Sequence, residues 1–158
     1  MADRLIKRLE KEGRLRKQKA GIVQVEALLQ QAIEDLKEAK KIAHLAERAT
    51  YVLAYMSMLK AGRALLLFNG YVPVDGAQHK TVVEVTEAFL GEKFRDLTEQ
   101  FEIMRRKRNE MTYEAGALLS MSESQKAFSD AISLVKEILK QVKIQNPQLE
   151  LKFNLGKE

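Results

Sequence analysis

The residues best suited to chemistry lie in one short stretch, MRRKRNEMTYE, at residues 104–114. Four consecutive cations are followed by an asparagine and, four residues later, by a tyrosine: Arg105, Arg106, Lys107, Arg108, Asn109 and Tyr113. Cations at this density bind polyanions through phosphate contacts and the release of counterions. The alternative is a solvated helix face or an ion pair between helices, because charge runs are common on helices.

Helical geometry divides this run. Successive residues of a helix turn by about 100°, so four adjacent cations cannot all serve one site. We expect Arg108 and Asn109 to face inward as ligand contacts, with some of the preceding cations pointing outward. Tyr113 then flanks the same site or packs against the protein with its hydroxyl satisfied.

Other candidate residues lie outside the run. Tyr51 and Tyr55, one helical turn apart, form a stripe with Arg48 that would stack a base and hold its phosphate. Core packing is the alternative for at least one of the two rings. The chain has two histidines, of which His79 is expected near a helix N-terminus, where the helix dipole lowers its pKa.

Composition excludes several classes of site. The chain has no cysteine, which rules out disulfides, thiolate zinc sites and a cysteine nucleophile, and we expect neither metal nor cofactor. No apolar stretch approaches the length of a membrane span or of a secretory signal, which favours a cytoplasmic protein. Residues 1–20 hold eight cations and three anions and so account for the whole net charge of +5. Such a basic arm would add a salt-dependent term to polyanion binding, unless it is only a solvated helix.

The apolar pattern predicts an all-α, up-and-down bundle of four to five helices. Between Ile22 and Ala46, apolar or small residues recur every three or four positions, with a break expected near residues 44–47. A helix through residues 51–68 should end at Asn69 and Gly70, and Gly62 within it suggests close approach of another helix. Three further helices are expected. The first covers residues 81–90 after a capping box of Asp75 and Gln78, and a strand at Val82–Val85 is the competing interpretation. The second runs from Phe94 through the basic run, and the third follows a capping box of Ser122 and Gln125 and ends at Asn146–Pro147.

The chain then divides into a basic N-terminal arm or helix (1–21), a helical bundle (22–147) and a C-terminal tail (148–158). In the tail, Leu149, Leu151, Phe153 and Leu155 alternate with the period of a strand, although no partner strand is expected. The tail is therefore expected to be loosely ordered or docked on a partner.

Three segments in this order, AYMSMLKAGRALLLFNGYVP, GAQHKTVVEV and MRRKRNEMTYE, closely resemble the HEPN family over about residues 10–148. The resemblance implies a helical bundle that forms a homodimer, often with a small nucleotidyltransferase as partner in a two-component, toxin–antitoxin-like system. Many members are metal-independent ribonucleases, whose motif pairs an arginine with a histidine in a cleft at the dimer interface.

Carried over residue by residue, the motif arginine is Arg108, its polar neighbour is Asn109, and Tyr113 stands where the histidine belongs. Tyrosine, with an ordinary pKa of about 10, is a poor general base at neutral pH. The first hypothesis is therefore a dimeric nucleotide- or RNA-binding module with Arg105, Arg108, Asn109 and Tyr113 in the cleft. The alternatives are a ribonuclease that uses Arg108 with Tyr113 or His79, and a structural or regulatory dimer without a nucleic-acid ligand.

Overall fold

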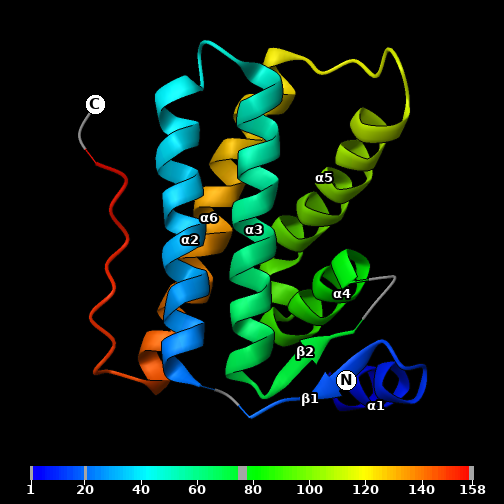
Figure 1. Cartoon of the computed structure of the whole chain (residues 1–158), viewed down its shortest axis with the longest axis vertical. Coiled ribbons are helices and arrows are strands. Elements are labelled where there is room, and N and C mark those ends of the chain that lie inside the picture. Colours follow the sequence, from blue (N-terminus) through cyan, green and yellow to red (C-terminus); the bar gives the residue numbers. More distant parts are fainter. Residues whose placement is uncertain (1, 20, 75–77, 157–158) are drawn as a thin grey trace.

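The chain folds as an all-α bundle with one very small sheet at its base. The computed structural model describes residues 2–19, 21–74 and 78–156 (Figure 1). Within these ranges the elements are α1 (Ala2–Lys11), β1 (Leu15–Lys17), α2 (Ile22–Ile42), α3 (Glu47–Phe68), β2 (Tyr71–Pro73), α4 (Gln78–Leu90), the 3-10 helix η2 (Glu92–Phe94), α5 (Arg95–Tyr113) and α6 (Met121–Gln145). The predicted fold class is confirmed.

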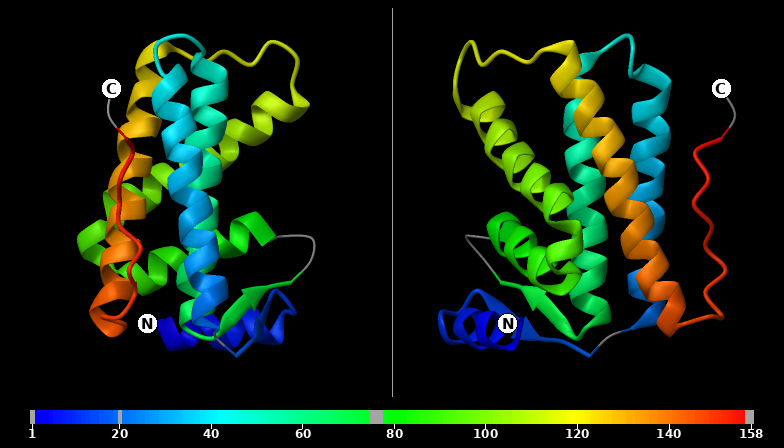
Figure 2. Two further views of the ribbon diagram at one scale, coloured as in Figure 1. Left: turned by 60° about the vertical axis from the view of Figure 1, so that its left-hand side comes forward. Right: turned by 180° about the vertical axis from the view of Figure 1, so that it is seen from behind.

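Helix α3 lies at the centre, and α2, α4, α5 and α6 all contact it (Figures 1 and 2). Thirteen of its residues are buried, as expected of a helix that is apolar around most of its circumference. Helix α2 packs beside it through the predicted seam of Val25, Leu29, Ala32, Leu36 and Ala39, all buried. The turn between the two helices spans residues 43–46, where the break was predicted.

The helix ends follow the sequence signals in most places. Asn69 caps α3 by donating from its side-chain nitrogen to the Leu65 carbonyl at 2.8 Å, and Gly70 follows with a φ of 90°. Residues 78–90 form a helix and not a strand, while Asp75 of the predicted capping box lies outside the described residues. The box before α6 is displaced by two residues from its predicted position, because Ser120 and Glu123 form it and not Ser122 and Gln125.

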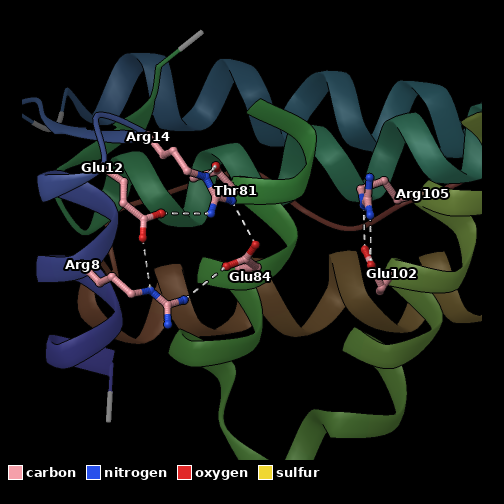
Figure 3. A network of polar contacts seen from close by, with 7 residues as sticks. All are labelled: Arg8, Glu12, Arg14, Thr81, Glu84, Glu102 and Arg105. Carbon is pink, nitrogen blue, oxygen red and sulfur yellow. Dashed lines mark hydrogen bonds and ion pairs between the residues drawn. The ribbon is translucent and has the colours of Figure 1, made fainter. Parts of the chain in front are cut away.

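The N-terminal segment is part of the folded body. Ile6 and Leu9 of α1 are buried, and β1 pairs antiparallel with β2, Leu15 opposite Pro73. The side chain of Arg14 donates to Thr81 Oγ1 at 3.1 Å and to the Glu84 carboxylate at 2.9 Å (Figure 3). These contacts with α4 engage part of the charge that the sequence assigned to a basic arm, and deleting the segment would expose core residues.

The C-terminal tail lies alongside the bundle, next to α2 (Figures 1 and 2). It has neither helix nor strand over residues 148–156, yet its alternate apolar residues pack on the core, and Leu149 is buried. Lys40 of α2 donates to the Gly156 carbonyl at 2.9 Å. The expectation of a loose or partner-bound tail is therefore wrong: the strand-like alternation points every second side chain at the chain's own helices.

In the described part of the chain, α3 alone has the length and apolarity to cross a membrane. In its most apolar stretch, 67% of the residues are buried inside the bundle. Its composition is accounted for by its central position in the core.

Gly62 marks the closest approach between α3 and α4. A Cβ atom there would lie 2.7 Å from Val82 Cγ1 and 2.9 Å from Thr86 Oγ1. Both neighbours are buried and β-branched, so they have little freedom to move aside. The close approach inferred from the sequence is confirmed.

We expect Gly62→Ala to destabilise the fold. Alanine gains about 1 kcal/mol of helix propensity over glycine, but overpacking a well-packed core costs about 1–3 kcal/mol. The net loss of up to about 2 kcal/mol should appear in urea unfolding as a lower midpoint with an unchanged slope.

The matched control adds Val82→Ala to the same chain. Gly62→Ala should cost less in the Val82→Ala chain than in the wild-type chain, because the contact with Val82 Cγ1 is gone while that with Thr86 Oγ1 remains. Equal effects of Gly62→Ala in both backgrounds would show that α4 does not press on Gly62.

Candidate functional site

The basic run occupies the C-terminal half of α5, where this helix leans away from α3 toward the edge of the bundle (Figures 1 and 2). Phe101 and Met104 are completely buried, and Arg108 follows Met104 on the side facing the bundle. Arg108 is partly buried, whereas Arg106 is largely exposed. Arg106 therefore points outward and Arg108 inward, but Asn109 lines a groove that Arg108 does not line, so the expected pairing of Arg108 with Asn109 at one site is not present within one protomer.

Three of the four cations are engaged by carboxylates. Arg105 donates two hydrogen bonds to Glu102, from Nε at 2.6 Å and from Nη2 at 3.0 Å (Figure 3). Arg106 donates to Glu102 at 3.0 Å, and Lys107 lies 3.6 Å from a carboxylate of α6. Among the described residues no carboxylate lies within ion-pair distance of Arg108. In the described part of the chain, Arg108 is therefore the member of the run without a carboxylate partner.

A second polar group lies where α3 meets the first turn of α4. The Tyr55 hydroxyl and His79 Nδ1 are 3.1 Å apart, and Arg63 donates from Nη2 to Gln78 Oε1 at 2.9 Å. The Tyr55 ring also packs on Phe101 of α5, with the ring centroids 6.0 Å apart. Side chains of α3, α4 and α5 therefore converge on this point.

Electrostatics connect this group to the basic run. Burial lowers the pKa of His79, and the positive charges of Arg63, Arg108 and Arg105 lower it further. Burial also raises the pKa of Tyr55 to about 12, so its hydroxyl keeps its proton at neutral pH. Three guanidinium groups from two helices therefore act on one neutral imidazole. We call Arg63, His79, Arg105 and Arg108, together with Tyr55, the arginine–histidine cluster.

His79 is the second residue of α4, which places it at a helix N-terminus as predicted. The pKa of His79 is also lowered, as predicted, and burial and the positive charges of the three arginines account for this. A histidine in this setting stays neutral at physiological pH unless an anion approaches.

The stacking role expected for Tyr51 and Tyr55 does not fit the structure. Tyr51 is 2% exposed and Tyr55 0%, so neither ring offers a face to a base. Both belong to the core, where the buried surface of α3 places them. Arg48, the third member of that predicted stripe, is exposed on the first turn of α3 and stands apart from the cluster.

Asn109 and Tyr113 belong to a different feature of α5. They line a shallow groove of about 370 Å³ together with Arg105, Arg106, Glu110 and Glu114. Tyr113 is 81% exposed, so the alternative of a packed tyrosine is also wrong. Arg108 does not line this groove, which means that one protomer does not bring Arg108 and Tyr113 into a common pocket.

Arg63 and Gln78 are members of the site that the sequence did not single out. Arg63 stands between the buried residues Gly62 and Ala64, within an otherwise apolar stretch of α3. An arginine in such a position must bring its charge to a polar edge of the core, and that requirement is the signal that would have identified it.

The cluster suits binding of a phosphate group. Guanidinium groups match phosphate oxygens through paired, charge-assisted hydrogen bonds. A neutral histidine beside them adds a group that can donate or accept a proton. Among the described residues, no group of three or more acidic or histidine side chains could hold a metal ion.

We expect Arg63→Gln to raise the pKa of His79, because Arg63 has the largest effect among the three positive charges that lower this pKa. Lys80→Gln is the matched control, since Lys80 is exposed on the same turn and is not among the causes of the shift. An NMR titration of the imidazole resonances measures both. An unchanged pKa in Arg63→Gln would separate Arg63 from the cluster.

The same shift makes stability depend on pH. The unfolded chain takes up the His79 proton near the ordinary pKa of about 6.5, while the folded chain does so only at lower pH. The contribution of His79 to the free energy of unfolding is therefore greatest above about pH 6.5 and falls as the pH drops toward the folded-state pKa.

Comparison with known proteins agrees with this architecture. The family model of the HEPN domain matches residues 25–145, which covers all of α3, α4, α5 and α6 and most of α2. A search among curated proteins gave no match to the chain. The match covers well over half of the sequence and includes every residue of the arginine–histidine cluster, and on this basis the chain belongs to the HEPN family.

Proposed function

We propose that this protein is a nucleotide- or RNA-binding module that holds phosphate at the arginine–histidine cluster. Membership of the HEPN family supports a nucleotide- or RNA-binding or nuclease-type module in general. The observation that carries the specific assignment is that Arg63 of α3 and His79 of α4 lie at the same helix junction through Gln78 and Tyr55, where the positive charges of Arg63, Arg105 and Arg108 all lower the pKa of His79. Among the described residues, Arg108 has no carboxylate partner.

The cluster favours an anion for energetic reasons. Like charges held close together on partly buried groups repel one another, and that repulsion is strongest where water is partly excluded. A phosphate group would relieve the repulsion and accept the guanidinium hydrogen bonds at the same time. Glu102 already offsets Arg105, so Arg108 and Arg63 are the contacts on which affinity should depend most.

A homodimer is part of the proposal. HEPN domains in general dimerise, and this chain exposes large apolar side chains on the outer face of α5 and on the segment after it. Ile103 is 57% exposed, Tyr113 81%, Leu118 82% and Met121 54%. Burying this face against a second copy would place the groove of Asn109 and Tyr113 at the interface, and apolar burial of this kind drives association.

The proposed partner is a nucleotidyltransferase in a two-component, toxin–antitoxin-like system. The support for it is the resemblance of the three sequence segments to the family. Copurification of the two proteins from cells that express both would test it.

The ribonuclease alternative rests on His79. His79 is neutral, hydrogen-bonded to Tyr55 and adjacent in charge to Arg108, which are the properties of a proton-transfer group beside a phosphate site. We favour binding, because Tyr113 replaces the motif histidine and lies in a groove that Arg108 does not line.

We expect Arg108→Ala to weaken RNA binding by about 1–3 kcal/mol, the range for a lost charge-assisted contact. Arg106→Ala is the matched control, since Arg106 is one turn or less away, is 72% exposed and is paired with Glu102. Its effect should stay below about 1 kcal/mol. Fluorescence anisotropy with a labelled oligoribonucleotide measures both, and equal losses would refute a special role for Arg108.

We expect the wild-type protein to retain RNA without cutting it, and Tyr113→His to gain slow, chelator-resistant cleavage if only the missing base prevents catalysis. Gel analysis of labelled RNA, with and without chelator, distinguishes the outcomes. Robust chelator-resistant cleavage by the wild-type protein that is lost in Arg108→Ala would establish the ribonuclease instead. If the protein neither binds nor cleaves RNA, the result would favour a structural or regulatory dimer.

A further inference from the structure

The largest cavity described for this chain lies between the C-terminal tail and the helices α2 and α6, away from the arginine–histidine cluster. Its volume is about 1140 Å³. Lys37, Lys40 and Lys41 of α2, with His44 of the turn that follows, form one wall, and Lys136 of α6 stands on another. We call this cavity the tail groove. It is bounded by residues that the proposed function does not use.

The charge of the tail groove is one-sided. Its described lining residues include four lysines and one histidine, and no aspartate or glutamate. The groove on α5, by contrast, is lined by two arginines and two glutamates, so its formal charges cancel. A cavity walled by like charges attracts counterions and anionic ligands. The occupant of the tail groove should therefore be an anion.

Existing contacts leave most of this charge in place. Lys40 donates to the Gly156 carbonyl at 2.9 Å, and the Lys136 nitrogen lies 5.1 Å from the centre of the Phe153 ring. A carbonyl and an aromatic face hold an ammonium group without neutralising it. Lys37 does meet a carboxylate, Glu34, at 3.3 Å, but both side chains are solvent-accessible and such pairs are weak.

The lysines of α2 form a line. Lys37, Lys40 and Lys41 have the spacing of one helix face and extend over about 6 Å at 1.5 Å per residue. A linear array of cations fits a linear polyanion better than a single small anion. It also fits an extended chain that follows the direction of α2.

Apolar and aromatic side chains complete the groove. Phe128 and Ile132 of α6 and Phe153 and Leu155 of the tail line it, and all four are only partly buried. A positively charged groove with accessible aromatic rings is the arrangement that binds single-stranded nucleic acid, because phosphates meet the cations and bases stack on the rings. We propose that the tail groove binds a short segment of single-stranded RNA.

This inference goes beyond the proposed function. The tail lies beside α2, on the other side of α3 from α5, in Figure 1 and in the right-hand view of Figure 2. The tail groove and the arginine–histidine cluster share no residue. A single RNA strand that contacts both would have to pass around the bundle, so each site can be tested by itself.

The test uses the absence of tryptophan from the chain. Phe153→Trp in the full chain places one fluorescent reporter in the tail groove, and Phe128→Trp gives a second reporter on α6 should the first disturb the tail. Oligouridylate of about eight nucleotides, within the range that single-strand sites cover, should quench either reporter saturably. The quenching should weaken with salt, as phosphate contacts do.

Charge-removing variants decide the assignment. Lys37 and Lys41 do not hold the tail in place. The double variant Lys37→Gln with Lys41→Gln should lower the affinity for oligouridylate, read from the quenching titration, about tenfold or more. The pair should also reduce the slope of log K against log salt by about 1.4, the value for two single-strand phosphate contacts. The control pair, Lys7→Gln with Lys17→Gln, removes the same charge from exposed positions of α1 and β1 and should have a much smaller effect.

The outcomes separate this site from the proposed function. Arg108→Ala should leave the Phe153→Trp response unchanged, even where it abolishes binding at the cluster. The inference would be overturned if oligouridylate quenched neither reporter. It would also be overturned by equal losses in the two lysine pairs, or by quenching with a glutamate-rich peptide in place of RNA, which would make the tail groove a protein-docking site.

Discussion

The burial of α3 is the constraint on which the rest of the structure depends. Four helices contact it, and its apolar residues can be removed from water only if nearly its whole surface is covered. Gly62 permits the close approach of α4, because a Cβ atom at this position would lie less than 3 Å from Val82 Cγ1 and Thr86 Oγ1. The position of α4, and with it the position of His79, follows from this packing.

The same burial decides where the polar groups of α3 go. Tyr55 and Arg63 cannot leave a hydroxyl or a guanidinium unsatisfied in the core, so each reaches the edge where α3 meets the first turn of α4. Arg105 and Arg108 arrive at that edge from α5. The arginine–histidine cluster is therefore a result of core packing as much as of the basic run of α5.

The sequence predicts the fold well because its helices carry strong local signals. The three-four seam of α2, the Asn69–Gly70 stop and the Gly62 approach are all present in the structure. The signals were weaker where tertiary contacts decide: the tail folds back on its own helices, and the N-terminal segment packs on α4 through Ile6 and Leu9. Each of these two contacts joins segments that are far apart in the sequence. The apolar periodicity of one segment shows that it has a face to bury but not which helix will cover that face.

The candidate site was predictable only in part for a similar reason. The motif arginine Arg108, its neighbour Arg105 and the lowered pKa of His79 follow from residue type and position. Arg63 was missed, because its importance arises from the approach of α4 and not from its neighbours in sequence. For Tyr51 and Tyr55 the spacing left stacking and core packing both open, because spacing alone does not say which face of α3 is covered, and both rings are buried.

The central claim is that a phosphate group binds among the arginines beside His79. The most direct measurement is the pKa of His79 by NMR, first in the free protein and then with saturating oligoribonucleotide. A bound phosphate offsets the charges of Arg63, Arg105 and Arg108, so the account predicts that the pKa rises on binding. A pKa that stays the same while binding is saturated would contradict the account and place the ligand elsewhere on the molecule.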